Sequence, residues 1–239
     1  MKKILIIGGA GFLGLHLTKK LIESEKIEID LLDNFSRGKK DKFLKKILIN
    51  KSVKLINKDL TKKISAYDRG YDYIFQFAAI IGVQNVLNNP MKVLSDNFLI
   101  QRNAIEIAEN QKKLKRFIFS STSEVHLGNQ IFNKLKYPTS ENHNIMLYDL
   151  NSSRTSYSLS KVYGESMCHF SNLKYTIIRP HNIYGERMGI SHVIPELVNK
   201  IKKMKKNQNL FLQSYDHKRC FCYIDDAINQ ILLLSKNNK

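Results

Sequence analysis

Short runs of branched apolar residues alternate with amphipathic stretches along this chain. Apolar runs without polar alternation are typical of strands that are buried on both faces of a parallel sheet. Such strands are predicted at residues 4–7, 27–32, 53–56, 71–77, 116–121 and 174–179. Apolar residues spaced three to four apart predict helices at residues 12–24, 91–111 and 158–171. The alternation predicts an α/β fold, a Rossmann-like doubly wound parallel sheet with helices on both faces.

Three glycines follow the first predicted strand at a spacing of three residues, Gly8, Gly11 and Gly14. Between a buried strand and a helix, they allow a tight turn, a close approach of bare backbone to a diphosphate, and close helix packing. The helix would direct the N–H groups of Phe12 and Leu13 and its positive dipole end at the anion. We therefore predict a dinucleotide site; the alternative is a glycine-rich turn that serves packing alone.

An acidic residue ends the second predicted strand, about twenty residues after the glycines, as dinucleotide sites require. Asp33 can accept hydrogen bonds from the adenosine ribose hydroxyls and would repel a 2′-phosphate, which favours NAD. Arg37 is the opposing signal, because a nearby arginine could pair with the 2′-phosphate of NADP. The balance of the two residues favours NAD.

The ends of the next two strands add weaker candidates for the same site. Asp59 and Leu60 could reach the adenine edge, although Asp59 could equally be the N-cap of a helix that starts near Thr61. Ala78 and Ala79 are small enough for their backbone to lie against a cofactor, and ordinary tight packing would explain them almost as well.

Hydroxyl groups and a carboxylate follow the fifth strand directly, in the stretch 120–124. Polar groups at the end of a buried strand are costly unless they are hydrogen-bonded or face a cleft, so Thr122 and Glu124 are predicted site residues. The polar, aperiodic stretch 129–152 that follows contains Pro138 and is a candidate substrate lid.

Tyr157 and Lys161 lie four residues apart, at the start of the last long predicted helix, and so share one helix face. A lysine cation close to a phenol favours the phenolate, which would lower the pKa of Tyr157 and make it a base near neutral pH. Alone the pair is weak evidence, since helix amphipathicity produces such spacings by chance.

Composition narrows the possible functions further. With 239 residues the chain can bury a full core, and its apolar stretches are shorter than a membrane span needs. The formal charge of +18 comes from lysines spread along the whole chain, so we expect attraction for anionic substrates and no specific nucleic-acid partner. The spacing of its three cysteines and seven histidines predicts no metal site, and the cysteines suit a reducing compartment. We expect a cytoplasmic protein without a membrane partner.

Taken together, these motifs resemble the extended short-chain dehydrogenase/reductase family, in its NAD-dependent sugar-nucleotide epimerase/dehydratase branch. The similarity covers residues 3–227. Its motifs are the glycine loop 8–14, the stretches 33–36, 119–125, 157–161 and 179–185, and the late Arg-Cys-Phe-Cys-Tyr-Ile-Asp-Asp stretch 219–226.

The resemblance implies a role for each matching residue. Tyr157 would be the acid/base, Lys161 would hold the nicotinamide ribose and lower the pKa of Tyr157, and Thr122 would bind the reacting sugar oxygen. Asn97 would support the active-site helix beside the cofactor, His181 would line the nicotinamide pocket, and Asn182 and Arg219 would contact the substrate, Arg219 at its diphosphate. Asn34 and Ser36 belong to the cofactor site with Asp33.

The implied reaction is NAD-dependent oxidation of a nucleotide sugar, most simply at C4, to a keto-sugar. Epimerisation, dehydration or decarboxylation can follow. Glu124 bears on this choice, because it could take a carbon-bound proton, or it could only cap the loop. The alternatives to an enzyme are a non-catalytic NAD-binding sensor on the same fold and a truncated, inactive family member.

The resemblance also divides the chain. Residues 1–180 are expected to form the NAD-binding domain with the catalytic residues, and residues 181–239 a small, incomplete substrate lobe, because family members usually carry several dozen further residues. A homodimer is the expected assembly. The family usually continues the Glu-Val motif with Tyr-Gly, whereas His126 and Leu127 precede Gly128 here, so the turn into the loop is expected to be rebuilt.

Overall fold

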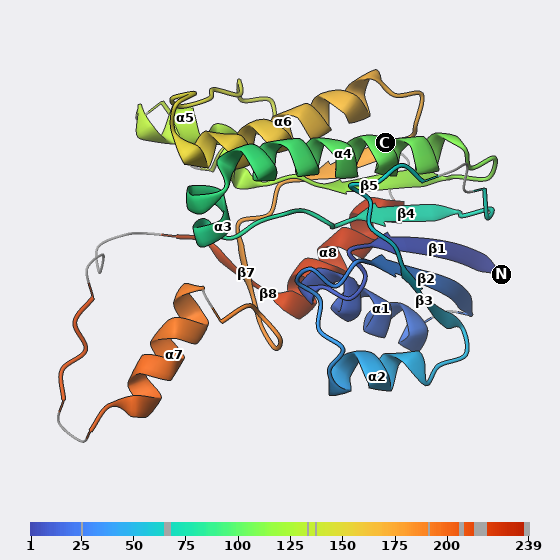
Figure 1. Cartoon of the computed structure of the whole chain (residues 1–239), viewed down its shortest axis with the longest axis horizontal. Helices are drawn as coiled ribbons and strands as arrows, with labels where there is room; N and C mark the ends of the chain where they lie inside the picture. Colours follow the sequence, from blue (N-terminus) through green and yellow to red (C-terminus); the bar gives the residue numbers. More distant parts are fainter. Residues whose placement is uncertain are drawn as a thin grey trace.

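A computed structural model shows an α/β fold built on one parallel sheet (Figure 1). It describes residues 1–24, 26–64, 68–132, 134–136, 138–190, 192–205, 208–212 and 219–236. In this described part of the chain, the large sheet has six strands in the order β3-β2-β1-β4-β5-β6. They are β1 (Lys2–Ile7), β2 (Ile27–Asp33), β3 (Val53–Asn57), β4 (Tyr73–Gln76), β5 (Arg116–Ser120) and β6 (Tyr175–Ile178). The predicted Rossmann-like fold is confirmed.

The strands lie where the apolar runs predicted them. Ile4, Leu5, Ile6 and Ile7 of β1 are all buried, as expected for a central strand covered on both faces. The strand predicted at residues 71–77 is shorter in the structure, where β4 covers Tyr73–Gln76, and the hydroxyl of Tyr71 before it donates to the buried Asp30 carboxylate.

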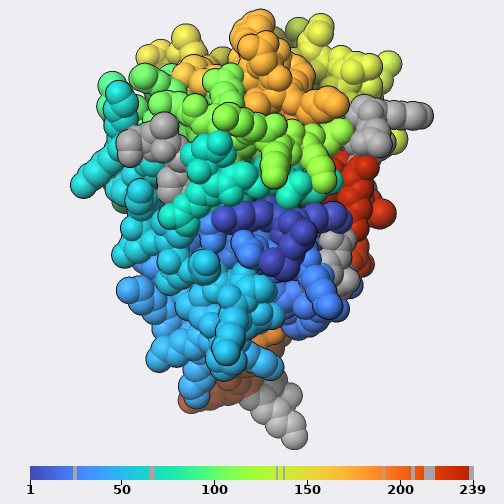
Figure 2. All heavy atoms as spheres, turned by 90° about the vertical axis from the view of Figure 1, so that its right-hand side faces the viewer, coloured from blue at the N-terminus to red at the C-terminus, as the bar shows by residue number. Residues whose placement is uncertain are grey.

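Helices cover both faces of the sheet. On one face lie α1 (Phe12–Ser24), α2 (Lys42–Leu48) and α8 (Ile224–Lys236), and on the other α4 (Pro90–Glu109) and α6 (Ser153–Phe170) (Figure 1). The view turned by 90° shows α8, in red, beside the first residues of the chain, in dark blue, although they are far apart in sequence (Figure 2). Ile224, Ile228 and Ile231 of α8 belong to the same buried cluster as Ile4 and Ile6 of β1.

The start of α6 differs from the prediction. The helix α6 begins at Ser153, five residues before the predicted start, so Tyr157 lies inside its second turn rather than at its opening. Its first turns are rich in serine and threonine: the hydroxyl of Ser156 donates to the Ser153 carbonyl at 2.7 Å, and that of Ser158 donates to the Thr155 carbonyl. Apolar periodicity could not reveal a start whose polar groups are satisfied by the helix backbone itself.

Short helical elements occur in two stretches where no helix was predicted. The stretch after β5 forms a 3-10 turn, η1 (Ser123–His126), and the short helix α5 (Leu127–Ile131), so the rebuilt turn expected at His126 is helical. Residues 83–88 form α3 (Val83–Asn88). The alternative of a helix near Thr61 is wrong, because the carboxylate of Asp59 accepts both the N–H and the hydroxyl of Thr61 at 2.9 Å and closes a turn instead.

The chain leaves the sheet after residue 180. A parallel pair of short strands, β7 (Asn182–Tyr184) and β8 (Phe221–Tyr223), precedes α8, and α7 (Val193–Lys203) stands away from the sheet (Figure 1). None of the described residues of α7 is buried. Across the described residues, no helix is both long and apolar enough to span a bilayer.

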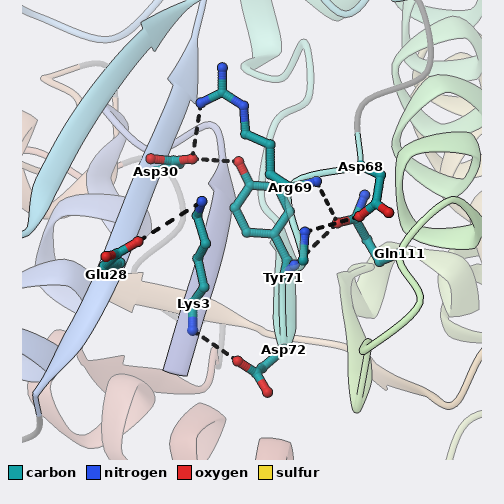
Figure 3. A network of polar contacts seen from close by, with 9 residues as sticks. Lys3, Glu28, Asp30, Asp68, Arg69, Tyr71, Asp72 and Gln111 are labelled. Atoms are coloured by element: carbon teal, nitrogen blue, oxygen red, sulfur yellow. Dashed lines mark hydrogen bonds and ion pairs between the residues drawn. The ribbon is translucent and has the colours of Figure 1, made fainter. Parts of the chain in front are cut away.

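A polar network ties the strands together at the edge opposite the glycine loop (Figure 3). The Tyr71 hydroxyl donates to the buried Asp30 carboxylate at 2.5 Å, and Gln111 accepts the backbone N–H groups of Arg69 and Tyr71. Asp72 accepts the N–H of Lys3 at 2.9 Å. These contacts fix β1, β2 and the start of β4, which places the other ends of these strands for the site.

Candidate active site

The glycine loop lies at the carboxyl end of β1, against the end of β4. Gly8 has a φ of +77°, and a Cβ atom there would lie 2.7 Å from the Ala78 nitrogen. A Cβ atom on Gly14 would lie 2.6 Å from the Gly8 carbonyl oxygen, so α1 can approach the loop only because both residues lack side chains. The first turn of α1, with Phe12 and Leu13, therefore presents its N–H groups beside bare backbone, a cradle that fits a diphosphate.

Asp33 is buried at the end of β2, next to the glycine loop. Its two carboxylate oxygens accept the backbone N–H groups of Ala10, at 2.9 Å, and Phe35, at 2.7 Å. Burial raises the pKa of this carboxyl, while the two hydrogen bonds and the charge of Arg187 oppose that change. A carboxylate so fixed keeps further lone pairs that fit ribose hydroxyls.

The other residues predicted around the adenosine lie close to Asp33 but differ in exposure. Asn34 and Ser36 are exposed, and the side chain of Asn34 donates a hydrogen bond to Asp59. The side chain of Leu60 is buried in the core, and its carbonyl accepts the amide of Asn103 at 2.7 Å. The structure thus leaves Asp59 facing the loop, whereas Leu60 presents no side chain to it.

A small cavity separates the end of β4 from α6. Asn97 of α4 organises it: its amide accepts the N–H of Ile80 at 2.7 Å and donates to the carbonyl of Ile80 and the hydroxyl of Ser160. Through Ser160, these contacts connect Asn97 to α6, the helix that carries Tyr157. The cavity is lined by Gln76, Ala78, Ala79, Asn97, Gln101, Phe119, Ser160 and Lys161.

Tyr157, Thr122 and Glu124 come together at the end of β5. Thr122 is buried at the N-cap of η1, where its hydroxyl accepts the N–H of Glu124 at 3.3 Å and also hydrogen-bonds the phenol of Tyr157. Glu124 forms an ion pair with Arg154 of α6 at 3.2 Å. The site therefore places a hydroxyl and a carboxylate beside the phenol.

The pKa of Tyr157 does not change as the sequence predicted. Burial and the negative charge of Glu124 raise it, and these outweigh the hydrogen bond from Thr122 and the charge of Arg37, which lower it. Lys161 lies 5.8 Å from the centre of the Tyr157 ring and donates to the Ser120 carbonyl at 2.7 Å. The lysine is thus turned to the strand, and the expected decrease in the pKa of Tyr157 is absent from this structure.

Lys161 itself is buried among these groups. Burial lowers the pKa of its ammonium group to about 8, and the charge of Glu165 opposes that change. Its amine is held at the floor of the cavity beside Ala78 and Ala79, where a cofactor ribose is predicted.

A buried ion pair behind the site escaped the sequence analysis. Glu165 accepts Nε and Nη2 of Arg179 at 2.9 and 2.7 Å and the Ser121 hydroxyl at 2.5 Å. His126, buried beside Arg179, has a pKa lowered by burial and by that guanidinium. The signal was present, since Glu165 follows Lys161 by four residues on the same helix face.

Three further residues that were predicted to contact nicotinamide or substrate lie after residue 180. His181 and Asn182 are exposed at the start of β7, where the amide of Asn182 donates to the Cys220 carbonyl at 3.1 Å. Arg219 is exposed just before β8. They lie on or beside the β7–β8 ribbon. The start of this ribbon adjoins the end of β5, because the carbonyl of Pro180 accepts the N–H of Ser123 at 3.1 Å.

Arg187 is a second residue that the sequence analysis missed. Its guanidinium donates to the Asp41 carboxylate at 2.6 Å and to the carbonyls of Ala10 and Lys39, at 3.1 and 2.9 Å. The neighbouring Glu186 carbonyl contacts the His16 ring of α1 at 3.0 Å. We call the three contacts of the Arg187 guanidinium the Arg187 clasp. The clasp fastens the segment after β7 to the glycine loop and to the loop after β2.

Comparison with known proteins agrees with this geometry. Residues 4–239 match the NAD dependent epimerase/dehydratase family. A UDP-N-acetyl-alpha-D-glucosaminuronate decarboxylase of Bacillus cytotoxicus is 31% identical over 235 residues, covering 95% of this chain and 69% of that protein. A putative UDP-glucose 4-epimerase of Methanocaldococcus jannaschii is 30% identical over 237 residues, covering 96% and 72%.

Solved structures show the same fold. A UDP-galactose 4-epimerase has a TM-score of 0.75 and 27% identity, over 96% of this chain and 70% of that one. The UDP-glucuronic acid 4-epimerase of Bacillus cereus, solved with UDP-glucuronic acid and NAD, has a TM-score of 0.80 over 99% of this chain and 74% of that one, at 24% identity.

The residues around the glycine loop fit NAD, which the family description names and which the Bacillus cereus structure contains. The glycines leave room for backbone to approach a diphosphate, and Asp33 offers a fixed carboxylate for a ribose. The family and the NAD cofactor predicted from the sequence are confirmed. This chain therefore belongs to the NAD-dependent epimerase/dehydratase family of the extended short-chain dehydrogenases/reductases.

Proposed function

We propose that this protein oxidises a nucleotide-activated sugar at C4, with Tyr157 as the group that exchanges the hydroxyl proton. The observation that carries the proposal is the contact between Tyr157 and Thr122 beside the cavity that holds Lys161. A phenol and a hydroxyl fixed at the end of β5 can both bond one sugar oxygen, the phenol to move its proton and Thr122 to stabilise the developing charge.

Because the pKa of Tyr157 is raised, catalysis requires interactions that favour loss of the phenol proton. In the structure, burial and Glu124 keep the phenol protonated at neutral pH. NAD, when bound, supplies the hydride acceptor and a positive charge in the groove. The chain itself supplies the Thr122 hydrogen bond and the charge of Arg37, which already act in the same direction, and Arg154 neutralises part of the opposing charge of Glu124.

The substrate nucleotide is proposed to lie along the segment after residue 180. Asn182 and Arg219 flank the β7–β8 ribbon, and the Arg187 clasp fixes where this ribbon begins relative to the glycine loop. In this arrangement residues 1–180 provide NAD binding and chemistry, and the following segment provides substrate contacts, as the predicted division of the chain requires.

Glu124 is proposed to determine the fate of the ketone. Its carboxylate is ion-paired with Arg154 and its charge acts on the phenol of Tyr157, which places it close to the reacting oxygen. For a substrate with a leaving group beyond C5, Glu124 takes the carbon-bound proton and elimination follows. For a uronic acid the ketone loses CO₂, and for other sugars re-reduction on the opposite face gives the epimer.

The test is product analysis with the purified chain, NAD and a panel of nucleotide sugars that includes hexoses, N-acetylhexosamines and uronic acids. Absorbance of the reduced cofactor follows oxidation, and chromatography separates epimers, dehydrated sugars and pentoses. Conversion of one sugar supports the proposal and names the reaction. Binding of NAD by calorimetry without conversion of any sugar contradicts it and favours the NAD-binding sensor.

A further inference from the structure

Arg37 lies in the loop between β2 and α2, directly above the cofactor groove. The next residue, Gly38, packs so closely on the glycine loop that a Cβ atom there would lie 2.9 Å from the Cβ of Ala10 and 3.1 Å from an oxygen of Asp33. The backbone of this loop is therefore in contact with the glycine loop, and the Arg37 side chain starts from that point.

The guanidinium of Arg37 is directed across the groove. Its Nη2 atom lies 3.9 Å from the position that a Cβ atom would take on Gly189, in the segment held by the Arg187 clasp. Its charge lowers the pKa of both Tyr157 and His192. The arginine whose charge acts on Asp33 is Arg187, not Arg37. Arg37 thus faces the side of the site toward Tyr157 and Gly189 rather than the Asp33 carboxylate.

The two arginines of this region differ in their partners. Arg187 is ion-paired with Asp41 at 2.6 Å. In the described part of the chain, no carboxylate is ion-paired with Arg37. The side chain of Arg37 is exposed, and partial burial of its guanidinium lowers its pKa. A guanidinium that no carboxylate neutralises can bind the oxygens of an anionic ligand.

We propose that Arg37 binds the diphosphate of NAD, together with the glycine loop, and takes no part in reading a 2′-phosphate. The planar fork of a guanidinium matches phosphate oxygens. This assignment removes the conflict between Asp33 and Arg37 in the sequence, because the arginine serves the middle of the dinucleotide while Asp33 serves the adenosine ribose. It rests on the NAD site of the proposed function and not on the reaction at the sugar.

The experiment compares ligand binding by isothermal calorimetry in the full chain and in Arg37→Ala, Arg37→Lys and Lys39→Ala. Lys39 is the matched control, since it is exposed, lies in the same loop and loses the same charge. The probes are NAD, ADP-ribose, NADP and adenosine. Arg37→Ala is expected to weaken NAD and ADP-ribose roughly tenfold to a hundredfold, the range for hydrogen bonds to charged groups. The NAD to NADP ratio and adenosine binding stay unchanged.

Further measurements separate the outcomes. Arg37→Lys, which keeps the charge but loses the fork, is expected to bind NAD with intermediate affinity, and the salt dependence of NAD binding becomes shallower in Arg37→Ala. Melting temperatures of the four proteins check that all are folded. Because the two arginine variants are read independently, an unfolded Arg37→Ala leaves Arg37→Lys and its ratio of ADP-ribose to adenosine affinity as the test.

Three results overturn the inference. A loss confined to NADP would assign Arg37 to the 2′-phosphate. Unchanged NAD binding, with weaker binding of UDP to the NAD-saturated protein, would assign it to the diphosphate of the nucleotide sugar. A decrease as large in Lys39→Ala would reduce the effect to general charge. If the wild-type chain itself fails to bind NAD, the proposed function falls with the inference; equal NAD affinity of wild type and Arg37→Ala removes the inference alone.

Discussion

The sheet and the segment between residues 181 and 223 hold their shape in different ways. Every residue of β5 is buried, whereas no described residue of α7 is buried. The segment is joined to the sheet region by polar contacts such as the Arg187 clasp and by Ile183 of β7, which is only partly buried against the apolar core. The groups that would perform chemistry thus lie on rigid elements, and the predicted substrate contacts lie on a lightly held one.

The largest expected effect is on catalysis, where a variant in the sheet region and a variant in the segment 181–223 should change different kinetic constants. Tyr157→Phe removes the proton-exchanging hydroxyl and should lower kcat by about 10² to 10⁴, with NAD affinity unchanged. Asn182→Ala, in β7, should instead raise KM with a smaller change in kcat, because it removes a contact made in ground and transition states alike. Steady-state kinetics on the substrate identified above measures both, and near-wild-type turnover by Tyr157→Phe would contradict the assignment.

The next effect concerns stability. Ile118 of β5 is fully buried and Ile201 of α7 is 56% exposed. Ile118→Ala removes the same atoms as Ile201→Ala but leaves a cavity in the core, so it should lower the free energy of unfolding by about 2–5 kcal/mol. Ile201→Ala should change it by less than about 0.5 kcal/mol. Urea denaturation followed by circular dichroism tests the pair; similar losses would show that α7 has a core of its own.

The buried ammonium group of Lys161 should make the free energy of unfolding depend on pH. Its pKa is lowered from 10.5 to about 8 in the folded protein, so between these values the unfolded chain binds more protons than the folded one. Stability contributed by this group therefore increases as pH rises from about 8 to 10.5, by up to about 3 kcal/mol.

The measurement is the difference in unfolding free energy between the wild type and Lys161→Met across this range. The unpaired Ser120 carbonyl left by the variant costs the same at every pH, so only the slope of the difference tests the burial of the charge. A difference that stays constant from pH 8 to 10.5 would contradict it.

The smallest effect should come from the Arg187 clasp. Its ion pair with Asp41 is partly exposed, so Arg187→Ala should lower the free energy of unfolding by only about 1 kcal/mol. The same change should make the segment after β7 more accessible, which limited proteolysis would detect as faster cleavage beyond residue 184. Lys39→Ala is the control, because Lys39 contributes only its carbonyl to the clasp. Equal cleavage rates would show that other contacts hold the segment.

Some features of this protein were determined by the sequence alone, because they depend on residues close together in the chain. The apolar runs specified the strands, the glycine spacing specified the turn into α1, and Asp33 ended β2 as predicted. The spacing of Tyr157 and Lys161 placed both on one face of α6. Each follows from the period of a helix or a strand, or from the backbone freedom of glycine.

Other features were decided only by the tertiary structure. The amine of Lys161 bonds to the Ser120 carbonyl, 41 residues away, so the pKa of Tyr157 is raised by burial and Glu124 instead of lowered. Arg37 faces Gly189, and Arg187 clasps Asp41, 146 residues away. Burial and charge at a side chain depend on which distant segments pack around it, and no spacing along the chain encodes those neighbours.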